Sequence, residues 1–273
     1  MKPLAAIKVL RPTNCFMAAL ATAIGYWASL SRFLVTVDLF TAMLAAFLVC
    51  GAGQAINDYF DRSIDRKTKP HRPIPSGKLS ARFVLAESLF LFVAGNALAY
   101  QVNAAAFLIS LVFTGLLLAY SSLLKKMKYV GNWIVASGTA VTLLFGASVS
   151  GSYFPVIFLA FSAMLANLGR ELTKDLEDLE GDQGHKVSLP MLIGHSPVKS
   201  LILFCYAFAV AVALFAGTRY YYEKAWFFPL IVFSGIVFAY AGFQALSDEF
   251  RKAQGLSKQA MMLALLAFAS VVL

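Results

Sequence analysis

Four oxygen-bearing side chains lie close together in the segment INDYFDRSIDRKT of this chain. Asn57, Asp61 and Asp65 recur every four residues, and Asp58 stands three residues before Asp61. Residues three or four apart share one face of a helix, so these side chains would form a first acidic row if the helix continues through the segment. Such a row requires a cationic partner, because like charges one turn apart repel each other.

A second acidic row occurs in the segment GRELTKDLEDLEGDQGHK. Asp175, Asp178 and Asp182 are spaced three and four residues apart, which again places them on one helical face. Both rows follow a long apolar stretch and therefore stand at the C-terminal end of a helix, where the macrodipole disfavours negative charge. Each row alone could be a set of ordinary solvated charges, neutralised by neighbours such as Arg62 and Lys174. Two rows of similar spacing favour a shared function.

A hard divalent cation suits these oxygen donors. Mg²⁺ commonly binds through one or two carboxylates and keeps other coordination positions for substrate phosphate. The sequence contains no zinc-type spacing, no Ser-His-Asp arrangement and no phosphate-binding glycine loop. Cys15, Cys50 and Cys205 are scattered through apolar segments and are interpreted as packing residues. The two rows therefore indicate magnesium binding next to a phosphorylated substrate.

The composition predicts that membrane helices position these rows. The chain is 60% hydrophobic and only 14% charged, with a mean hydropathy of +0.73, which is more apolar surface than a water-soluble protein can bury. The formal charge of +9 does not indicate nucleic-acid binding, because the basic residues lie between apolar stretches, as in membrane proteins. We expect an all-α polytopic membrane protein that forms a single domain over residues 1–273.

Nine apolar windows are candidates for transmembrane helices. They cover residues 12–31, 37–60, 81–101, 104–124, 130–150, 153–176, 197–217, 226–246 and 259–273. The last window is the shortest, because roughly 15 helical residues rise only about 22 Å against a hydrocarbon core of about 30 Å. This helix is therefore expected to start earlier or to tilt little.

The distribution of basic residues predicts the orientation. Of the 23 Lys and Arg residues, all but Arg32, Arg219 and Lys224 lie in the N-terminal segment or around gaps that follow even-numbered helices. By the positive-inside rule, the N-terminus and these gaps face the cytoplasm. Both acidic rows lie on this side, so we expect the active site at the cytoplasmic face of the cell membrane.

The motifs resemble those of the UbiA-type intramembrane prenyltransferases. The resemblance rests on NDYFDRSID followed by RPIPSGKLS, on RELTKDLEDLEGD, on LRPTN before the first window and on AYSSLLKKMKYVGN between the fourth and fifth windows. It extends over nearly the whole chain. The family's fold implies nine helices around a central cavity that opens to the cytosolic side and laterally to lipid, which agrees with the number of windows and the side of the motifs.

The resemblance implies transfer of a polyprenyl group from its diphosphate to an acceptor, with Mg²⁺ as the cofactor. The implied metal ligands are Asn57, Asp58, Asp61, Asp65, Asp175, Asp178 and Asp182. The expected catalytic carboxylates are Asp61, Asp65, Asp178 and Asp182. Six carboxylates exceed the direct needs of the metal ions, so some are expected to orient the others. The metal ions would stabilise the leaving diphosphate as the allylic C–O bond breaks.

Cationic side chains should share the diphosphate. The candidates are Lys67, Arg72 and Lys125, followed by Lys126, Arg170 and Lys174, and Tyr120 and Asn14 could add hydrogen bonds. Arg11 is interpreted as an anchor at the membrane interface. The prolines and the glycine of segment 70–77 predict a structured loop that could close over the site.

The acceptor is expected from resemblance within the family. The two acidic motifs and RPIPSGKLS are most similar to archaeal enzymes that transfer a geranylgeranyl group to the sn-2 hydroxyl of geranylgeranylglyceryl phosphate during ether-lipid synthesis. The implied partners are thus a prenyl diphosphate donor, a prenylated glycerol phosphate acceptor and the lipid bilayer. Relatives that prenylate 4-hydroxybenzoate or a naphthoate for quinone synthesis provide an alternative acceptor class.

A membrane transporter is the alternative from another functional class. Its ionisable residues usually lie near the bilayer midplane on broken helices, whereas both acidic rows lie at helix ends. CDP-alcohol phosphotransferases also place clustered aspartates at membrane helix ends. Their signature contains a tight Asp-Gly with a nearby Ala-Arg, and neither acidic row contains it.

Overall fold

The protein is helical throughout the part of the chain that the structure describes. The structure is a computed structural model that describes residues 3–124, 127–179 and 187–273. Within these ranges there is no strand, and one isolated backbone bridge joins Met127 and Val187. Eight helices among the described residues are long and apolar enough to cross a membrane. The prediction of an all-α polytopic membrane fold is confirmed.

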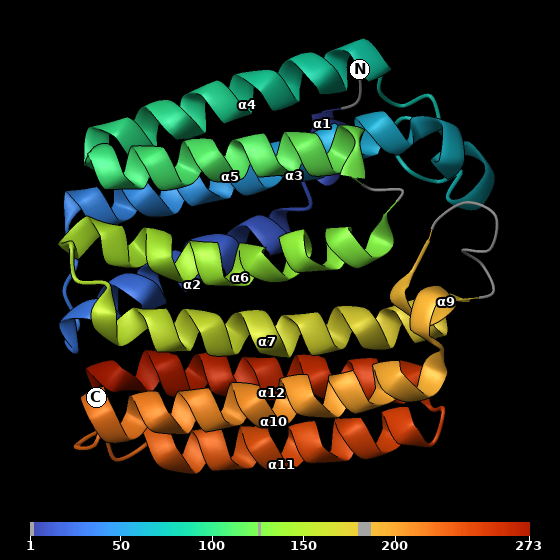
Figure 1. The fold of residues 1–273 in the computed structure, drawn as a ribbon. Coiled ribbons are helices and arrows are strands. Elements are labelled where there is room, and N and C mark those ends of the chain that lie inside the picture. The colour runs from blue at the N-terminus through green and yellow to red at the C-terminus, as the bar shows by residue number, and fades with distance from the viewer. Residues whose placement is uncertain (1–2, 125–126, 180–186) are drawn as a thin grey trace. The chain divides into compact units, whose positions relative to one another are not determined.

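Figure 1 shows the order of the elements along the chain. They are α1 (Pro3–Val9), α2 (Pro12–Leu30), α3 (Val37–Thr68), α4 (Ala81–Val102), α5 (Ala104–Ser122), α6 (Lys128–Ser150), α7 (Phe154–Glu177), α9 (Leu189–Ile193), α10 (His195–Tyr220), α11 (Phe227–Leu246), α12 (Phe250–Ala269) and the 3₁₀ helix η2 (Ser270–Val272). Each of the nine predicted windows coincides with a helix. The first, α2, is not among the eight, so a count of nine spanning helices stays a prediction.

Two helices are longer than the hydropathy pattern predicted. Helix α3 continues past residue 60 to Thr68. Hydropathy does not detect its last turns, because they are charged rather than apolar. Arg66 and Lys67 in the last turn interact favourably with the negative end of the helix dipole. Pro70 then disfavours continuation of the helix. The last long helix, α12, begins at Phe250 rather than at residue 259, since its first turns are polar. It therefore starts earlier, as its short apolar window required.

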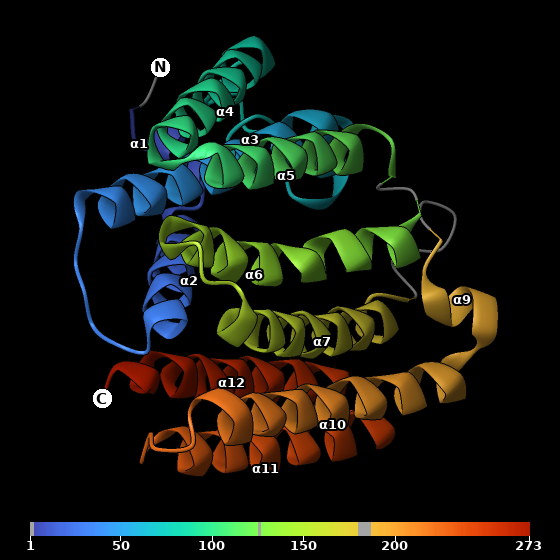
Figure 2. The same ribbon diagram turned by 60° about the vertical axis from the view of Figure 1, so that its left-hand side comes forward.

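The chain divides into two compact units, and one of the boundaries between them falls within α2. The first unit contains residues 1–23 and 35–123, and the second contains residues 24–34 and 124–273. In the first unit, α3 packs against both α4 and α5, and α1 packs against α3 (Figure 2). In the second unit, α7 packs against α6, α10 and α12, while α11 packs against α10 and α12.

Small residues bring the helices of the first unit together. Ala45, Ala52 and Ala55 on α3 have no exposed surface. At Gly95 of α4, an added Cβ would lie only 2.7 Å from Cγ2 of Val49. Close packing of this kind matters in a bilayer, where lipid tails are as apolar as side chains and the hydrophobic effect gives helix association little support.

The second unit contains a still closer approach between helices. At Gly25 of α2, an added Cβ would lie 2.0 Å from the carbonyl oxygen of Leu143 in α6. At Gly169 of α7, it would lie 2.6 Å from the ring of Tyr206 in α10. Any larger side chain at Gly25 would have to displace main-chain atoms, so this glycine sets the spacing between α2 and α6.

Within each unit, segments that the basic residues assign to the same side of the membrane lie close together in the structure. Near the loop between α3 and α4 of the first unit, Leu79 packs with Ala5 and Val9 of the N-terminal segment. In the second unit, the hydroxyl groups of Ser29 and Ser150 lie 2.6 Å apart, which brings together two gaps predicted on the opposite side. The grouping agrees with the predicted topology. The assignment of one side to the cytoplasm stays a prediction.

Candidate functional site

The first acidic row lies on one continuous helix, as its spacing required. Thr36 caps the start of helix α3, where its hydroxyl accepts a hydrogen bond from the amide of Leu39, and the helix continues through Asp65. At 1.5 Å per residue, Asp58 lies about 32 Å along the axis from Val37, close to the thickness of a hydrocarbon core. The row therefore stands near one membrane surface. Asp58 and Asp65 are buried, with 4% and 3% exposure.

Arg72 binds both buried carboxylates of this row. Its Nη1 lies 3.1 Å from Oδ1 of Asp58 and 2.6 Å from Oδ2 of Asp65. The loop that carries Arg72 is ordered by main-chain hydrogen bonds from Ser76 to Arg72 and from Gly77 to Ile74. Gly77 adopts a left-handed φ of 73°, which glycine permits without strain. The prediction of a structured loop is confirmed, and its closure over the site stays a hypothesis.

Arg11 is the second cation of the first acidic row. It lies in the turn between α1 and α2, with a left-handed φ of 52° and Pro12 immediately after it. Its Nη2 lies 2.6 Å from Oδ1 of Asp58, and its Nη1 donates to Oε1 of Gln54. The interpretation of Arg11 as an interfacial anchor overlooked this contact. A carboxylate 47 positions along the chain is its partner.

The remaining residues of the first row lie toward its accessible side. Asn57 and Asp61 are partly exposed, and the Asn57 amide lies 3.4 Å from Oδ2 of Asp61. Lys67 and Asn14, both predicted to contact diphosphate, are exposed. Tyr120 on α5 is partly buried. The structure thus places Arg72 in direct contact with the row and shows Lys67 and Asn14 at the surface.

The second acidic row begins on α7 in the second unit. Asp175 has no exposed surface, and its Oδ2 accepts a hydrogen bond of 2.7 Å from the Asn132 amide of α6. Helix α7 ends at Glu177, before Asp178. Asp178 caps the helix, and its amide donates to the carbonyl of Lys174. Asp182 lies outside the described residues, as do Lys125 and Lys126.

Further polar residues extend the second row deeper along α7. Asn167 and Glu171 precede Asp175 at intervals of four residues, and both are buried. Arg170, a predicted diphosphate ligand, donates to Glu171 and lies 3.1 Å from the Asn167 side-chain oxygen. Its guanidinium is therefore oriented by its own helix. Lys174, one turn later, is partly exposed.

The acidic rows do not form a ready-made cage for a metal ion. Among residues 3–124, 127–179 and 187–273, no group of three or more His, Cys, Asp or Glu side chains converges closely enough to hold one. The donor set nevertheless suits Mg²⁺, because both rows contain only carboxylate and amide oxygens. One or two carboxylates suffice when substrate phosphates complete the coordination. The residues therefore fit a metal ion that binds together with a phosphorylated substrate.

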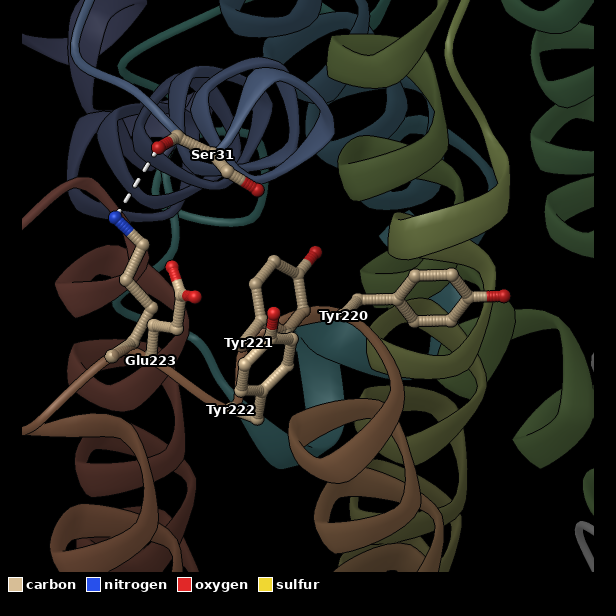
Figure 3. A pocket seen from close by; sticks show the side chains of 6 residues that line it. Ser31, Tyr220, Tyr221, Tyr222 and Glu223 are labelled. Atoms are coloured by element: carbon tan, nitrogen blue, oxygen red, sulfur yellow. Dashed lines mark hydrogen bonds between the residues drawn. The ribbon is translucent and has the colours of Figure 1, made fainter.

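A small pocket in the second unit lies at the loops that follow α2 and α10 (Figure 3). It is lined by Ser31, Tyr220, Tyr221, Tyr222, Glu223 and Lys224. Lys224 donates to the carbonyl of Ser31 over 3.3 Å, which joins the loop after α2 to the loop after α10. Hydrogen bonding to Glu223 raises the pKa of Tyr222, and burial raises the pKa of Tyr221. This pocket contains none of the predicted site residues.

Sequence reasoning missed polar side chains that contact an aspartate or an arginine of the two rows. Gln54, Asn132, Asn167 and Glu171 were not assigned a role, and Arg11 was assigned a different one. Gln54 precedes Asp58 by one helical turn within an apolar stretch, and Glu171 and Asn167 precede Asp175 by one turn and two turns. Polar residues inside a membrane helix usually have a partner, so this pattern was the available signal.

The chain is similar in sequence and in structure to proteins of one known family. The model of the UbiA prenyltransferase family matches residues 18–269. A relative from Methanothrix thermoacetophila, named digeranylgeranylglyceryl phosphate synthase, is 38% identical over 212 residues, or 76% of this chain and 78% of that protein. A solved structure concerned with digeranylgeranylglyceryl phosphate synthase in membranes covers 100% of this chain and 99% of its own, with a TM-score of 0.86 and 31% identity.

A more distant solved structure shares the fold. It is a UbiA homolog from Archaeoglobus fulgidus bound to GPP and Mg²⁺, with a TM-score of 0.72 and 17% identity. The match covers 97% of this chain and 99% of that one.

Proposed function

Because this chain belongs to the UbiA prenyltransferase family, we propose that it transfers a geranylgeranyl group from its diphosphate to the sn-2 hydroxyl of geranylgeranylglyceryl phosphate. The allylic C–O bond to the diphosphate breaks, and the same carbon forms a bond to the acceptor oxygen. Diphosphate and the hydroxyl proton are released. The product is digeranylgeranylglyceryl phosphate, the compound named in the similar synthases.

The first acidic row is the observation that carries this proposal. Asp58 and Asp65 stand near one end of a membrane helix, beside arginines from two other segments of the chain. Carboxylates suit Mg²⁺, whereas guanidinium groups suit phosphate oxygens. A magnesium-bound diphosphate requires both kinds of group, and a lipid-linked substrate requires them at the membrane surface.

Mg²⁺ is the proposed cofactor. Its candidate ligands in the first row are Asn57, Asp58, Asp61 and Asp65, and those in the second row are Asp175, Asp178 and Asp182. Asp61, Asp65, Asp178 and Asp182 are the proposed catalytic carboxylates. When bound, the ion would neutralise charge on the leaving diphosphate. The UbiA homolog from Archaeoglobus fulgidus, which shares this fold, was solved with Mg²⁺ and GPP.

Cationic and polar side chains of this chain would bind the diphosphate. The proposed set is Asn14, Lys67, Arg72, Tyr120, Lys125, Arg170 and Lys174. Arg72 has the strongest structural support, because it already bridges two carboxylates of the first row. A guanidinium can donate to a carboxylate and to a phosphate oxygen at the same time, since it has five N–H donors.

The setting of the reaction follows from the fold. The chain is an integral, multi-pass membrane protein by its family and by the eight long apolar helices found among its described residues. We propose that the N-terminus and both acidic rows face the cytoplasm, because the basic residues gather around the same gaps. We also propose that residues 1–273 act as a single catalytic domain around a central cavity open to the cytosolic side.

Mass spectrometry of products tests donor and acceptor together. Purified protein in lipid nanodiscs would receive a mixture of prenyl diphosphates, geranylgeranylglyceryl phosphate, 4-hydroxybenzoate and a naphthoate. We expect digeranylgeranylglyceryl phosphate and free diphosphate, and no product after EDTA treatment. A prenylated aromatic product alone would favour the quinone alternative. Ion flux without any turnover would favour the transporter.

Single carboxylate changes test the assignment of the acidic rows. Asp61→Asn and Asp178→Asn should each abolish transfer while the protein stays folded in detergent. Asp38→Asn is the matched control, because Asp38 lies in the first turn of the same helix as Asp61. It should retain activity. Full activity in Asp61→Asn or Asp178→Asn would contradict the assignment.

A further inference from the structure

Arg11 joins two side chains that lie one helical turn apart on α3. Its Nη1 donates to Oε1 of Gln54, and its Nη2 donates to Oδ1 of Asp58 at 2.6 Å. The two arms of one planar guanidinium therefore fix both partners at once. A lysine could not reproduce this contact, because its ammonium is a point charge without the rigid fork.

Both arginines of the first acidic row bind the same oxygen of Asp58. Arg11 and Arg72 each donate to Oδ1, and Arg72 also donates to Oδ2 of Asp65. The other oxygen of Asp58, Oδ2, accepts from neither arginine. A carboxylate held in this way cannot rotate freely, and one defined oxygen is left for another ligand.

The segment that carries Arg11 is itself fixed. Arg11 has a left-handed φ of 52°, Pro12 restricts the chain after it, and the thiol of Cys15 donates to the carbonyl of Leu10 at 3.1 Å. On the other side of the turn, Val9 is buried in a cluster with Ala55 of α3. The guanidinium is therefore presented to Asp58 from a turn that is packed against the same helix.

We propose that Arg11 is a positioning residue that holds Asp58 through Oδ1 and leaves Oδ2 to bind a divalent cation. The inference rests on the proposed function, since it assigns the cation to the magnesium site of prenyl transfer. Arg11 acts through Asp58 and does not itself contact the reacting atoms. Gln54 supports it by occupying the second arm of the guanidinium.

Metal affinity is the quantity that this role should change. Partners that orient a metal ligand typically contribute 10- to 100-fold to affinity. We expect Arg11→Ala to raise the dissociation constant for Mn²⁺, measured by electron paramagnetic resonance without substrate, by about tenfold or more. The Mg²⁺ concentration for half-maximal activity should rise in parallel. At saturating Mg²⁺, the KM for prenyl diphosphate should stay close to that of the wild type.

Arg62→Ala is the matched control for charge. Arg62 is on α3 next to Asp61, but its Nη1 donates to the carbonyl of Tyr59 at 2.8 Å and its guanidinium lies over the Tyr59 ring. Its removal lowers the net charge as much as Arg11→Ala does and should leave Mn²⁺ affinity almost unchanged. Thermal unfolding in detergent would identify variants that do not fold. Arg11→Lys and Gln54→Leu would then supply the test, with smaller losses of affinity in the same direction.

A double substitution separates positioning from general stabilisation. If Arg11 acts through Asp58, adding Arg11→Ala to Asp58→Asn should not weaken Mn²⁺ binding further. Unchanged Mn²⁺ affinity in a folded Arg11→Ala protein would overturn the inference. A large rise in the KM for prenyl diphosphate at saturating Mg²⁺, with unchanged metal affinity, would also overturn it and assign Arg11 to the diphosphate.

The wild-type protein distinguishes the two levels of the argument. If it binds Mn²⁺ but transfers no prenyl group to any acceptor, the proposed function fails. If it transfers the group and Arg11→Ala binds Mn²⁺ normally, only the role of Arg11 fails.

Discussion

The two acidic rows hold their buried aspartates by different means. In the first row, Asp58 is bound by two arginines that lie 47 and 14 positions away along the chain. In the second row, Asp175 accepts a hydrogen bond from a neutral amide, that of Asn132. Arg170, which lies on α7 one turn before Lys174, is bound by its neighbour Glu171. Among the contacts within residues 3–124, 127–179 and 187–273, ion pairs between separate segments support the first row, whereas the Asn132 amide and neighbours on α7 support the second.

The difference indicates how each row responds to a loss of charge. Removing one member of a buried ion pair leaves the other charge without its partner, which costs more than the loss of a neutral hydrogen bond. An amide that bonds to a carboxylate can also bond to another amide. The first row should therefore couple catalysis to stability more strongly than the second row does.

Replacing Asp58 of the first row and Asp175 of the second gives the largest expected difference between the rows. Asp58→Asn and Asp175→Asn should both reduce prenyl transfer on the order of 100-fold, because each removes a proposed metal ligand. Their stabilities should differ. Asp58→Asn should lower the free energy of unfolding by about 2–3 kcal/mol, since Arg11 and Arg72 lose a shared charge in a partly buried site. Asp175→Asn should cost about 1 kcal/mol, because the new amide oxygen can still accept from Asn132.

Denaturant titration in detergent with EDTA measures these stabilities without the contribution of a bound metal. Equal losses in the two variants would break the comparison between the rows. A larger loss in Asp175→Asn would reverse it.

Replacing the partners of the aspartates gives a smaller effect. Arg72→Ala should raise the KM for prenyl diphosphate about tenfold, because it removes a charge-assisted donor from the proposed diphosphate site. Asn132→Leu should lower kcat about tenfold through the orientation of Asp175 and leave that KM nearly unchanged. Steady-state kinetics at saturating Mg²⁺ separates the two results. A rise of KM in Asn132→Leu alone would assign Asn132 to the donor and contradict the expected division of roles.

The first acidic row could be predicted from the sequence because its information is local. The intervals between Asn57, Asp61 and Asp65 fixed their common face once α3 was helical, and the structure confirms that helix. The partners could not be predicted in the same way. Asn132 lies 43 positions from Asp175, and only tertiary packing brings the two together.

The ends of the helices illustrate the same limit. Hydropathy located the apolar parts of α3 and α12 but not their polar turns, because charged residues carry no apolar signal even when they are helical. Arg11 was misinterpreted for a related reason. A basic residue at the start of a membrane segment is usually an anchor, and only the contact with Asp58 distinguishes it from one.

The dependence of stability on salt should give the smallest and most specific difference between the rows. Raising the ionic strength from 0.1 M to 1 M shortens the Debye length from about 10 Å to about 3 Å, which weakens ion pairs that remain partly exposed. The side chains of Arg11 and Arg72 are 34% and 19% exposed, so the pairs with Asp58 should be screened in part. The stability difference between the wild type and Asp58→Asn should therefore shrink at high salt, by less than about 1 kcal/mol. The difference between the wild type and Asn132→Leu should not change, because the Asn132 amide carries no charge. Thermal unfolding of the three proteins at both salt concentrations, with EDTA present, measures this directly, and an equal salt response of both variants would show that the two rows are held by the same kind of interaction.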